Sequence, residues 1–203
     1  KILFVGRIDP EKSIEEMISY LESINTFNWE LKLIGDGTIK QELENKLIKY
    51  KNIKFLGKIP RNELVKYYNQ ADLFINPSKT ESLGFTTLEA LACNTTVLAF
   101  NQGGTKDIIK DNHNGFLYNN KDEFYEKLNL IINDKKLVSD VNKNGLKFCQ
   151  DKNIPNQSEF LINQYSEMIN NKKYIEINYF NRMIFLLYLI LFSLLKIVGK
   201  LKS

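Results

Sequence analysis

Cysteine and histidine are scarce in this chain of 203 residues, and their scarcity excludes whole classes of protein. The two cysteines, Cys93 and Cys149, stand far apart, so they predict separate free thiols in a reducing compartment rather than a disulfide scaffold. With one histidine, His113, and no Asp-x-Asp sequence, the chain lacks the ligand clusters that are typical of metal sites. The residues themselves therefore indicate no metal site.

An excess of charge of one sign is also missing. The formal net charge is only +4, and most lysines have an acidic residue nearby in the sequence. Such a balance does not predict a nucleic-acid-binding surface. Only four residues are proline and 43% are hydrophobic, which is typical of one globular domain with a sizeable core and an appendage.

Short apolar runs alternate with helical stretches over residues 1–150. Continuous hydrophobic strands separated by helices predict a parallel sheet that is covered on both faces, in a doubly wound, Rossmann-like α/β domain. Ligands of such domains bind at the carboxyl ends of the strands. The expected strands are Ile2–Val5, Glu30–Ile34, Ile53–Leu56, Leu73–Asn76, Val97–Phe100 and Gly115–Tyr118, and the expected helices are Ser13–Leu21, Ile39–Lys49, Arg61–Tyr68, Thr87–Cys93, Thr105–Lys110 and Lys121–Asn133.

The strongest candidate site follows the fourth expected strand. Gly84 permits a tight turn there, and a helix is expected to open near Thr86. The first amides of a helix have no intrahelical acceptors, so they form an anion site that suits a diphosphate. Glu81 precedes this helix and Glu89 lies two turns inside it, so both carboxylates can accept hydrogen bonds from the hydroxyls of one sugar ligand. Taken alone, two such acids are also compatible with ordinary surface residues.

The segment ESLGFTTLEALA, from Glu81 to Ala92, resembles the donor-site signature of family-4-type (group 1) retaining glycosyltransferases of the GT-B fold. Further motifs of that family follow in the expected order, so the resemblance covers roughly residues 1–150. They are Phe4-Val5-Gly6-Arg7 with Lys12, the Gly35-Asp36-Gly37 turn, Phe55-Leu56-Gly57 followed by Lys58-Ile59-Pro60, the strand Ala71–Ser78, Gly103-Gly104 with Asp107, and Asn114-Gly115-Phe116-Leu117.

The resemblance implies a site for a nucleoside-diphosphate sugar and a role for each matching residue. Arg7 and Lys12 would neutralise the pyrophosphate and the charge that grows on it as the glycosidic bond breaks. In this family these cations and the helix end take the place of a metal ion, so the resemblance implies neither a metal nor another cofactor. Glu81 would bind sugar hydroxyls near the reacting carbon, and Glu89 the ribose hydroxyls. The residues expected to be catalytic are Glu81, Arg7 and Lys12, and those expected to bind the donor are Gly6, Arg7, Lys12, Gly35, Lys58, Ile59, Glu81, Gly84, Phe85, Thr86 and Glu89.

Two positions depart from the family's pattern. Asn94-Thr95-Thr96 replaces Gly-x-Pro after the helix that carries the second glutamate. Asparagine tolerates the left-handed backbone conformation, so we expect the turn to survive. Ser13 follows Lys12 where glycine is common, which we expect to be harmless.

In this family an N-terminal domain supplies the acceptor site, and that domain is missing from this chain. The chain begins with lysine inside an expected strand, so we expect it to be part of a longer protein. The donor-binding half alone should bind the donor weakly and transfer nothing. The whole enzyme is expected to act on a glycan or lipid-linked acceptor in glycolipid or surface polysaccharide synthesis. The alternatives are a non-catalytic nucleotide-sugar-binding or scaffold domain and a sugar-nucleotide epimerase.

Residues 151–171 are expected to form a C-terminal helix, and residues 172–203 a hydrophobic tail. The stretch from Met183 to Val198 is apolar apart from Ser193 and Lys196, and Arg182, Lys200 and Lys202 bracket it. As a helix it would be about 25 Å long, slightly shorter than a bilayer core of about 30 Å. We expect a membrane anchor that holds the enzyme at the cytoplasmic face of a membrane. A helix packed on the protein or on the missing domain is the alternative.

Overall fold

A six-stranded parallel sheet forms the centre of the computed structural model, which describes residues 1–24 and 26–151. Its strands are β1 (Ile2–Val5), β2 (Leu31–Ile34), β3 (Ile53–Gly57), β4 (Leu73–Asn76), β5 (Thr96–Phe100) and β6 (Phe116–Tyr118). They lie in the order β3-β2-β1-β4-β5-β6, and each strand pairs in parallel with its neighbours. The expected doubly wound α/β fold is therefore confirmed.

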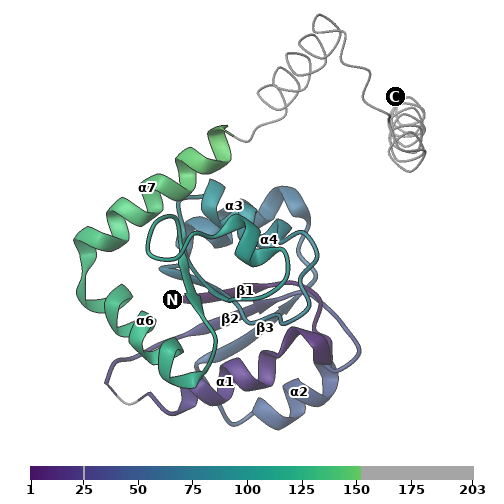
Figure 1. Cartoon of the computed structure of the whole chain (residues 1–203). Helices are drawn as coiled ribbons and strands as arrows, with labels where there is room; N and C mark the ends of the chain where they lie inside the picture. The colour runs from purple at the N-terminus through teal and green to yellow at the C-terminus, as the bar shows by residue number, and fades with distance from the viewer. Residues whose placement is uncertain (25, 152–203) are drawn as a thin grey trace, which may run out of the picture. The chain divides into compact units, whose positions relative to one another are not determined.

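Helices cover both faces of this sheet (Figure 1). They are α1 (Ile14–Glu22), α2 (Lys40–Leu47), α3 (Arg61–Gln70), α4 (Phe85–Ala92), α5 (Thr105–Ile108), α6 (Lys121–Asn133) and α7 (Lys135–Asp151), with a 3-10 turn at Pro10–Lys12. Alternate side chains of β1 enter two separate buried clusters, Ile2 and Phe4 on one face and Leu3 and Val5 on the other. α1, α2 and α6 pack on the first cluster and α3, α4 and α5 on the second, while α7 contributes Val141 to the first and packs Phe148 on the second. The strands are hydrophobic throughout because both of their faces are buried.

The ends of some helices differ from the expectation. α4 begins at Phe85 rather than Thr87, because Gly84 takes the left-handed conformation (φ 62°, ψ 36°) and ends the preceding loop. α7 follows α6 after Asp134 alone and lies beyond the last helix expected within residues 1–150. The remainder of the expected C-terminal helix and the whole hydrophobic tail, residues 152–203, lie outside the described residues. Within residues 1–24 and 26–151, no helix has the length and apolarity needed to span a bilayer.

Both departures from the family's pattern occupy left-handed backbone. Asn94 has φ 58°, so the asparagine keeps the turn after α4, as expected. Ser13 has φ 51° and ψ 33°, a conformation that costs a residue with a Cβ atom about 1–2 kcal/mol. The expectation that serine is harmless at this position is therefore only partly right, since glycine would fit the turn without that cost.

The strand order reverses between β1 and β4, which are neighbours in the sheet but are separated along the chain by β2 and β3. The loops that follow β1 and β4 therefore leave the sheet in different directions and open a crevice at its carboxyl edge. All but one of the residues expected to be catalytic or to bind the donor belong to the loops and helix starts along this edge. The exception, Glu89, lies farther along α4.

Candidate active site

Two adjoining cavities open at the carboxyl ends of β1 and β4. The first, which we call the Lys12 cavity, has a volume of about 170 Å³, and the second, the Glu89 cavity, about 300 Å³. They share Val5, Phe85 and Thr86 and so form one continuous surface. The Lys12 cavity is lined by Phe4, Val5, Gly6, Arg7, Lys12, Asn76, Glu81, Phe85 and Thr86, and the Glu89 cavity by Val5, Arg61, Leu64, Phe85, Thr86 and Glu89.

Lys12 and Glu81 form the central ion pair of the first cavity. The Lys12 ammonium lies 2.9 Å from Glu81 Oε2 and also donates to the buried hydroxyl of Ser78 at 3.3 Å. Only 15% of the lysine side chain and 19% of the glutamate side chain are exposed. The pair joins the 3-10 turn after β1 to the loop after β4, so it bridges the crevice where the strand order reverses.

The loop that carries Glu81 is held against the start of α4. Glu81 Oε1 accepts a hydrogen bond from the Gly84 amide at 3.3 Å, and the Glu81 carbonyl accepts one from the Gly104 amide at 2.7 Å. In the buried core below, the Asn76 amide group donates to the Thr87 hydroxyl at 3.1 Å. α4 consequently directs its amino end, with its positive end of the helix dipole, into the Lys12 cavity.

Arg7 lies at the mouth of the Lys12 cavity, where it pairs with two carboxylates. Its guanidinium contacts Asp9 Oδ2 and Glu11 Oε1, both at 2.8 Å, and 70% of the side chain is exposed. Asp9 is nearly buried, and its Oδ1 accepts hydrogen bonds from the amide and the hydroxyl of Thr38. The two Thr38 hydrogen bonds, followed by the charge of Arg7, hold the pKa of Asp9 below its usual value. Asp9 thus ties the cation to the loop after β2.

We expect Asp9→Asn to change how stability depends on pH. Because the folded-state pKa of Asp9 lies below its usual value of 3.8, its carboxylate stabilises the fold fully above that pH, and this contribution is lost as pH falls through the folded-state pKa. The melting temperature of the variant should therefore be lower than that of the wild type at pH 7, and the gap should close in strong acid. Melting curves from about pH 7 to pH 2 test this. A gap of constant size over that range would contradict the role given to the Asp9 carboxylate.

Glu89 points from α4 into the second cavity, and both of its carboxylate oxygens accept hydrogen bonds from side chains of α3. Oε1 accepts from Arg61 Nε at 3.1 Å and from Arg61 Nη2 at 2.8 Å, and Oε2 accepts from the Tyr68 hydroxyl at 3.0 Å. Arg61 and Tyr68 both belong to α3. The wall beside them is apolar, formed by Val5, Leu64 and Phe85, and Phe85 is 58% exposed. The cavity therefore offers a fixed carboxylate next to a flat hydrophobic surface.

Four predicted donor-binding residues line neither of the two cavities: Gly35, Lys58, Ile59 and Gly84. Gly84 lies directly before the start of α4, where its amide donates to Glu81. Gly35 supports the first cavity from behind, since its amide donates to the Gly57 carbonyl at 2.9 Å and its Cα lies against the Gly6 carbonyl. Lys58 is exposed, with its ammonium 3.8 Å from Asp36 Oδ2, and Ile59 packs on the core beneath α3. All four residues lie at the carboxyl edge of the sheet but outside the lining of both cavities.

Comparison with known proteins identifies the family of this domain. The family model described as "Glycosyl transferases group 1" matches residues 1–148. The chain belongs to this family. A glycosyltransferase of Methanocaldococcus jannaschii is 33% identical over 152 residues, which cover 73% of this chain and 42% of that protein. An α-1,4-N-acetyl-D-galactosaminyltransferase of Campylobacter jejuni, whose name describes a glycan on PP-undecaprenol, is 31% identical over 179 residues, 83% of this chain and 48% of that protein.

A solved structure shows which part of a group 1 glycosyl transferase the chain resembles. The C-terminal domain of such a protein from Francisella tularensis has a TM-score of 0.65 and 29% identity, over 74% of this chain and 85% of that one. The chain spans about half or less of the length of the curated relatives that it matches. The GT-B C-terminal architecture expected from the sequence is therefore confirmed.

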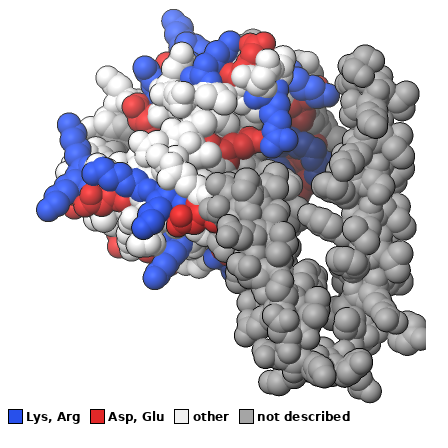
Figure 2. All heavy atoms as spheres, turned by 90° about the horizontal axis from the view of Figure 1, so that it is seen from above, with Lys and Arg blue, Asp and Glu red and all other residues white. Residues whose placement is uncertain are grey.

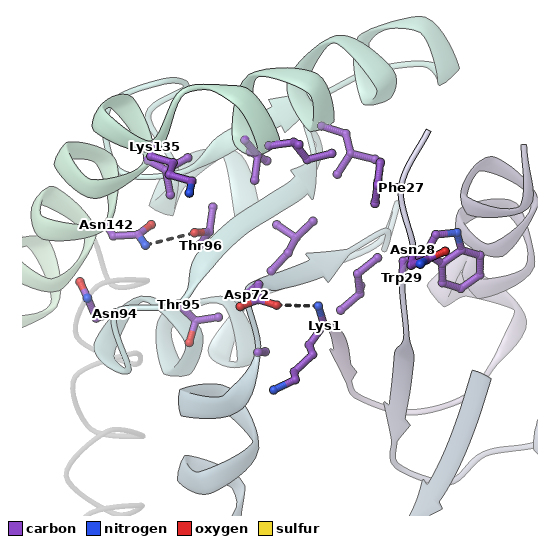
Figure 3. A pocket seen from close by; sticks show the side chains of 17 residues that line it. Lys1, Phe27, Asn28, Trp29, Asp72, Asn94, Thr95, Thr96, Lys135 and Asn142 are labelled. Carbon is purple, nitrogen blue, oxygen red and sulfur yellow. Dashed lines mark hydrogen bonds and ion pairs between the residues drawn. The ribbon is translucent and has the colours of Figure 1, made fainter. Parts of the chain in front are cut away.

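A larger cavity of this glycosyl transferase domain, about 570 Å³, lies at the opposite edge of the sheet (Figure 3). Lys1, Leu73 and Thr96 line it at the amino ends of their strands, and side chains of α6 and α7 close it. Figure 3 shows the amino group of Lys1 paired with Asp72, at 2.6 Å, and Asn142 donating to Thr96. None of the residues expected to be catalytic or to bind the donor lines this cavity, so we place the candidate site in the smaller cavities.

Acidic and basic side chains are interspersed around an uncharged area on the face of the glycosyl transferase domain shown in Figure 2. Many charged side chains of the domain form ion pairs, such as Lys79 with Glu16 at 2.6 Å and Lys46 with Glu15 at 2.7 Å. In the part of the chain that the structure describes, no group of three or more His, Cys, Asp or Glu side chains is arranged to hold a metal ion.

The sequence missed four residues that hold the site together: Asp9, Ser78, Arg61 and Tyr68. Asp9 and Ser78 lie inside family motifs, but no pattern indicated that they bind Arg7 and Lys12. Arg61 and Tyr68 lie outside these motifs on α3, which comes near Glu89 only in the folded sheet. The parallel topology could have indicated α3 as a neighbour of α4, but not which of its side chains contact Glu89.

Proposed function

We propose that this chain is the donor-binding half of a retaining glycosyltransferase that uses a nucleoside-diphosphate sugar. The Lys12 cavity carries the proposal. In it a lysine, an arginine, a carboxylate and the start of α4 lie together at the point of the sheet at which the strand order reverses. Family membership of residues 1–148 supports it. The donor's diphosphate lies at the start of α4 in this proposal, its sugar beside Glu81 and its nucleoside in the Glu89 cavity.

The electrostatics of the Lys12 cavity suit a leaving diphosphate. As the glycosidic bond breaks, negative charge grows on the leaving phosphate oxygen, and fixed cations and helix dipoles stabilise it. Lys12, Arg7 and the amides of Gly84 to Thr86 supply that charge here, in place of a metal ion. In the structure Lys12 and Arg7 are already paired with carboxylates, so the diphosphate must take over these cations when it binds.

The two glutamates account for recognition of the hydroxyl groups. A carboxylate accepts hydrogen bonds from two neighbouring hydroxyls, as both ribose and a hexose offer. Once the diphosphate holds Lys12, Glu81 is released to bind hydroxyls of the transferred sugar near the reacting carbon. Glu89 binds the ribose, and the apolar wall of Val5, Leu64 and Phe85 packs against the nucleoside. The backbone around Lys58 and Ile59 extends this wall toward the base.

The whole protein needs more than this chain for transfer. We propose that an N-terminal domain supplies the acceptor site, as the short coverage of the relatives suggests. The acceptor we propose is a lipid-linked glycan at the cytoplasmic face of a membrane, by analogy with the Campylobacter jejuni relative. Residues 172–203 are proposed to hold the enzyme there, with residues 151–171 as the connecting helix.

The test of donor binding is a thermal-shift panel of UDP-, GDP- and ADP-glucose on the complete protein. A ligand that binds only the folded state at 100 times its Kd stabilises it by about 2.7 kcal/mol. We expect one nucleotide sugar to raise the melting temperature, and Glu89→Ala and Arg7→Ala to abolish that rise. Glu63→Ala, which removes an exposed carboxylate of α3 outside both cavities, is the matched control and should leave the rise intact.

Two other outcomes would decide against parts of the proposal. If no nucleotide sugar at millimolar concentration shifts the melting temperature, the proposed donor site is wrong. If a donor binds but the complete protein transfers no sugar to a lipid-linked acceptor, the alternative of a non-catalytic binding domain replaces the enzyme. The retaining mechanism is checked separately, by the anomeric configuration of the product in proton NMR.

A further inference from the structure

Tyr68 is a buried tyrosine whose only polar side-chain atom faces the candidate site. The residue is 1% exposed, and its hydroxyl donates to Glu89 Oε2 at 3.0 Å. The ring packs on Phe74 of β4, with centroids 5.7 Å apart, and the Tyr68 carbonyl accepts from the buried Thr95 hydroxyl at 2.9 Å. Neighbouring elements on two sides therefore fix the position of the hydroxyl.

Glu89 has two partners, and their surroundings decide which of them holds it. Arg61 contacts Oε1 from outside, and 80% of its side chain is exposed. An ion pair in water contributes little, because both ions are well solvated and a long side chain loses rotamer freedom. Tyr68 contacts Oε2 from the core, where a hydrogen bond to a charged group is stronger and has no competing water. The hydrogen bond from Tyr68 should thus fix the orientation of the Glu89 carboxylate, whereas water can readily replace the contact with Arg61.

We propose that Tyr68 is a positioning residue for recognition of the donor's ribose, acting through Glu89. By holding Oε2, the tyrosine orients the carboxylate so that its remaining lone pairs face the Glu89 cavity and its ribose hydroxyls. This inference rests on the proposed function, since it concerns how the same site recognises the nucleotide.

The protonation state of Tyr68 favours this role. Burial, and then the charge of Glu89, raise the pKa of the Tyr68 hydroxyl far above its usual value. The hydroxyl therefore stays protonated at neutral pH and donates its hydrogen bond to Glu89. A ligand oxygen has no access to it, because the ring is buried beneath the carboxylate.

The test is the preference of the complete protein for a ribonucleotide over its dideoxy form. Calorimetry first selects the tightest binder among UDP, GDP and ADP, and then measures that nucleotide and its 2′,3′-dideoxy form. Tyr68→Phe removes only the hydroxyl, and we expect it to weaken ribonucleotide binding about tenfold, the usual order for a lost hydrogen bond to a charged group. Binding of the dideoxy nucleotide should stay within about twofold of wild type.

Tyr67→Phe is the matched control, since it deletes the same group from the adjacent residue of α3, whose ring lies near the ammonium groups of Lys32 and Lys66. It should change neither affinity. Equal weakening of both nucleotides by Tyr68→Phe would mean a structural role and would overturn the proposal, as would unchanged ribonucleotide binding. If the wild-type protein binds the ribonucleotide and its dideoxy form equally well, the site does not recognise the ribose hydroxyls and the proposal is wrong. If the protein binds no nucleotide at all, the proposed function is wrong as well.

Discussion

Lys12→Ala is expected to lower kcat of the complete enzyme by roughly 100- to 1,000-fold, the usual cost of removing one group that stabilises charge in a transition state. Lys12 is the least exposed cation of the Lys12 cavity and lies against Glu81, where the proposed diphosphate leaves. Because the leaving group gains charge only as the bond breaks, the change should fall mainly on kcat rather than KM. Steady-state kinetics with saturating acceptor measure both constants.

Lys79→Ala is the matched control for this change. Lys79 belongs to the loop that carries Glu81, but its ammonium pairs with Glu16 at 2.6 Å and it lines neither cavity of the site. Its replacement should alter kcat less than about threefold, since an exposed ion pair contributes little. A Lys12→Ala enzyme that is folded and retains wild-type kcat would show that this lysine does not stabilise the leaving group.

Gly35→Ala should be among the most destabilising single changes in this chain, with a loss of about 4 kcal/mol in the free energy of unfolding. A Cβ atom at Gly35 would overlap the carbonyl of Gly6, and the backbone has φ 142°, which side-chain-bearing residues rarely adopt. Neither backbone segment can retreat, because the Gly6 amide is bound to Ile34 and the Gly35 amide to Gly57. Urea unfolding measures the effect.

Gly57→Ala is the control that separates the two causes of the expected loss of stability, the steric overlap of the Cβ atom and the strain of a positive φ. Gly57 also has positive φ, at 66°, but a Cβ atom there would meet nothing within 4 Å. Its replacement should therefore cost only the left-handed conformation, about 1–2 kcal/mol. If both variants lose the same free energy, the close approach of the loops after β1 and β2 is not what requires glycine at position 35.

The sheet could be predicted from the sequence because its strands are continuous hydrophobic runs with a single interpretation. β1 and β4 have the expected bounds, since each is buried on both faces and followed by polar loop residues. Helix ends were harder to predict. The start of α4 depends on the left-handed backbone of Gly84, and hydrophobic periodicity does not report such a local conformation.

The candidate site could be predicted in its charged residues but not in their partners. Lys12 and Glu81 were both expected, yet their direct pairing joins positions 69 apart and depends on how two loops meet. The role of Tyr68 is even harder to predict from the sequence, because a tyrosine on an apolar helix face is typical of a core residue. Only the crossing of α3 and α4 shows that its hydroxyl ends on a carboxylate of the site.

The most direct test of the donor site is a crystal structure of the complete protein with its nucleotide sugar bound. Our account predicts the diphosphate at the start of α4, in contact with Lys12 and Arg7, and the ribose hydroxyls on Glu89. It also predicts that the ion pair between Lys12 and Glu81 is broken in that complex. A nucleotide bound instead in the cavity of about 570 Å³ at the amino ends of the strands, with the Lys12–Glu81 pair intact, would contradict the account.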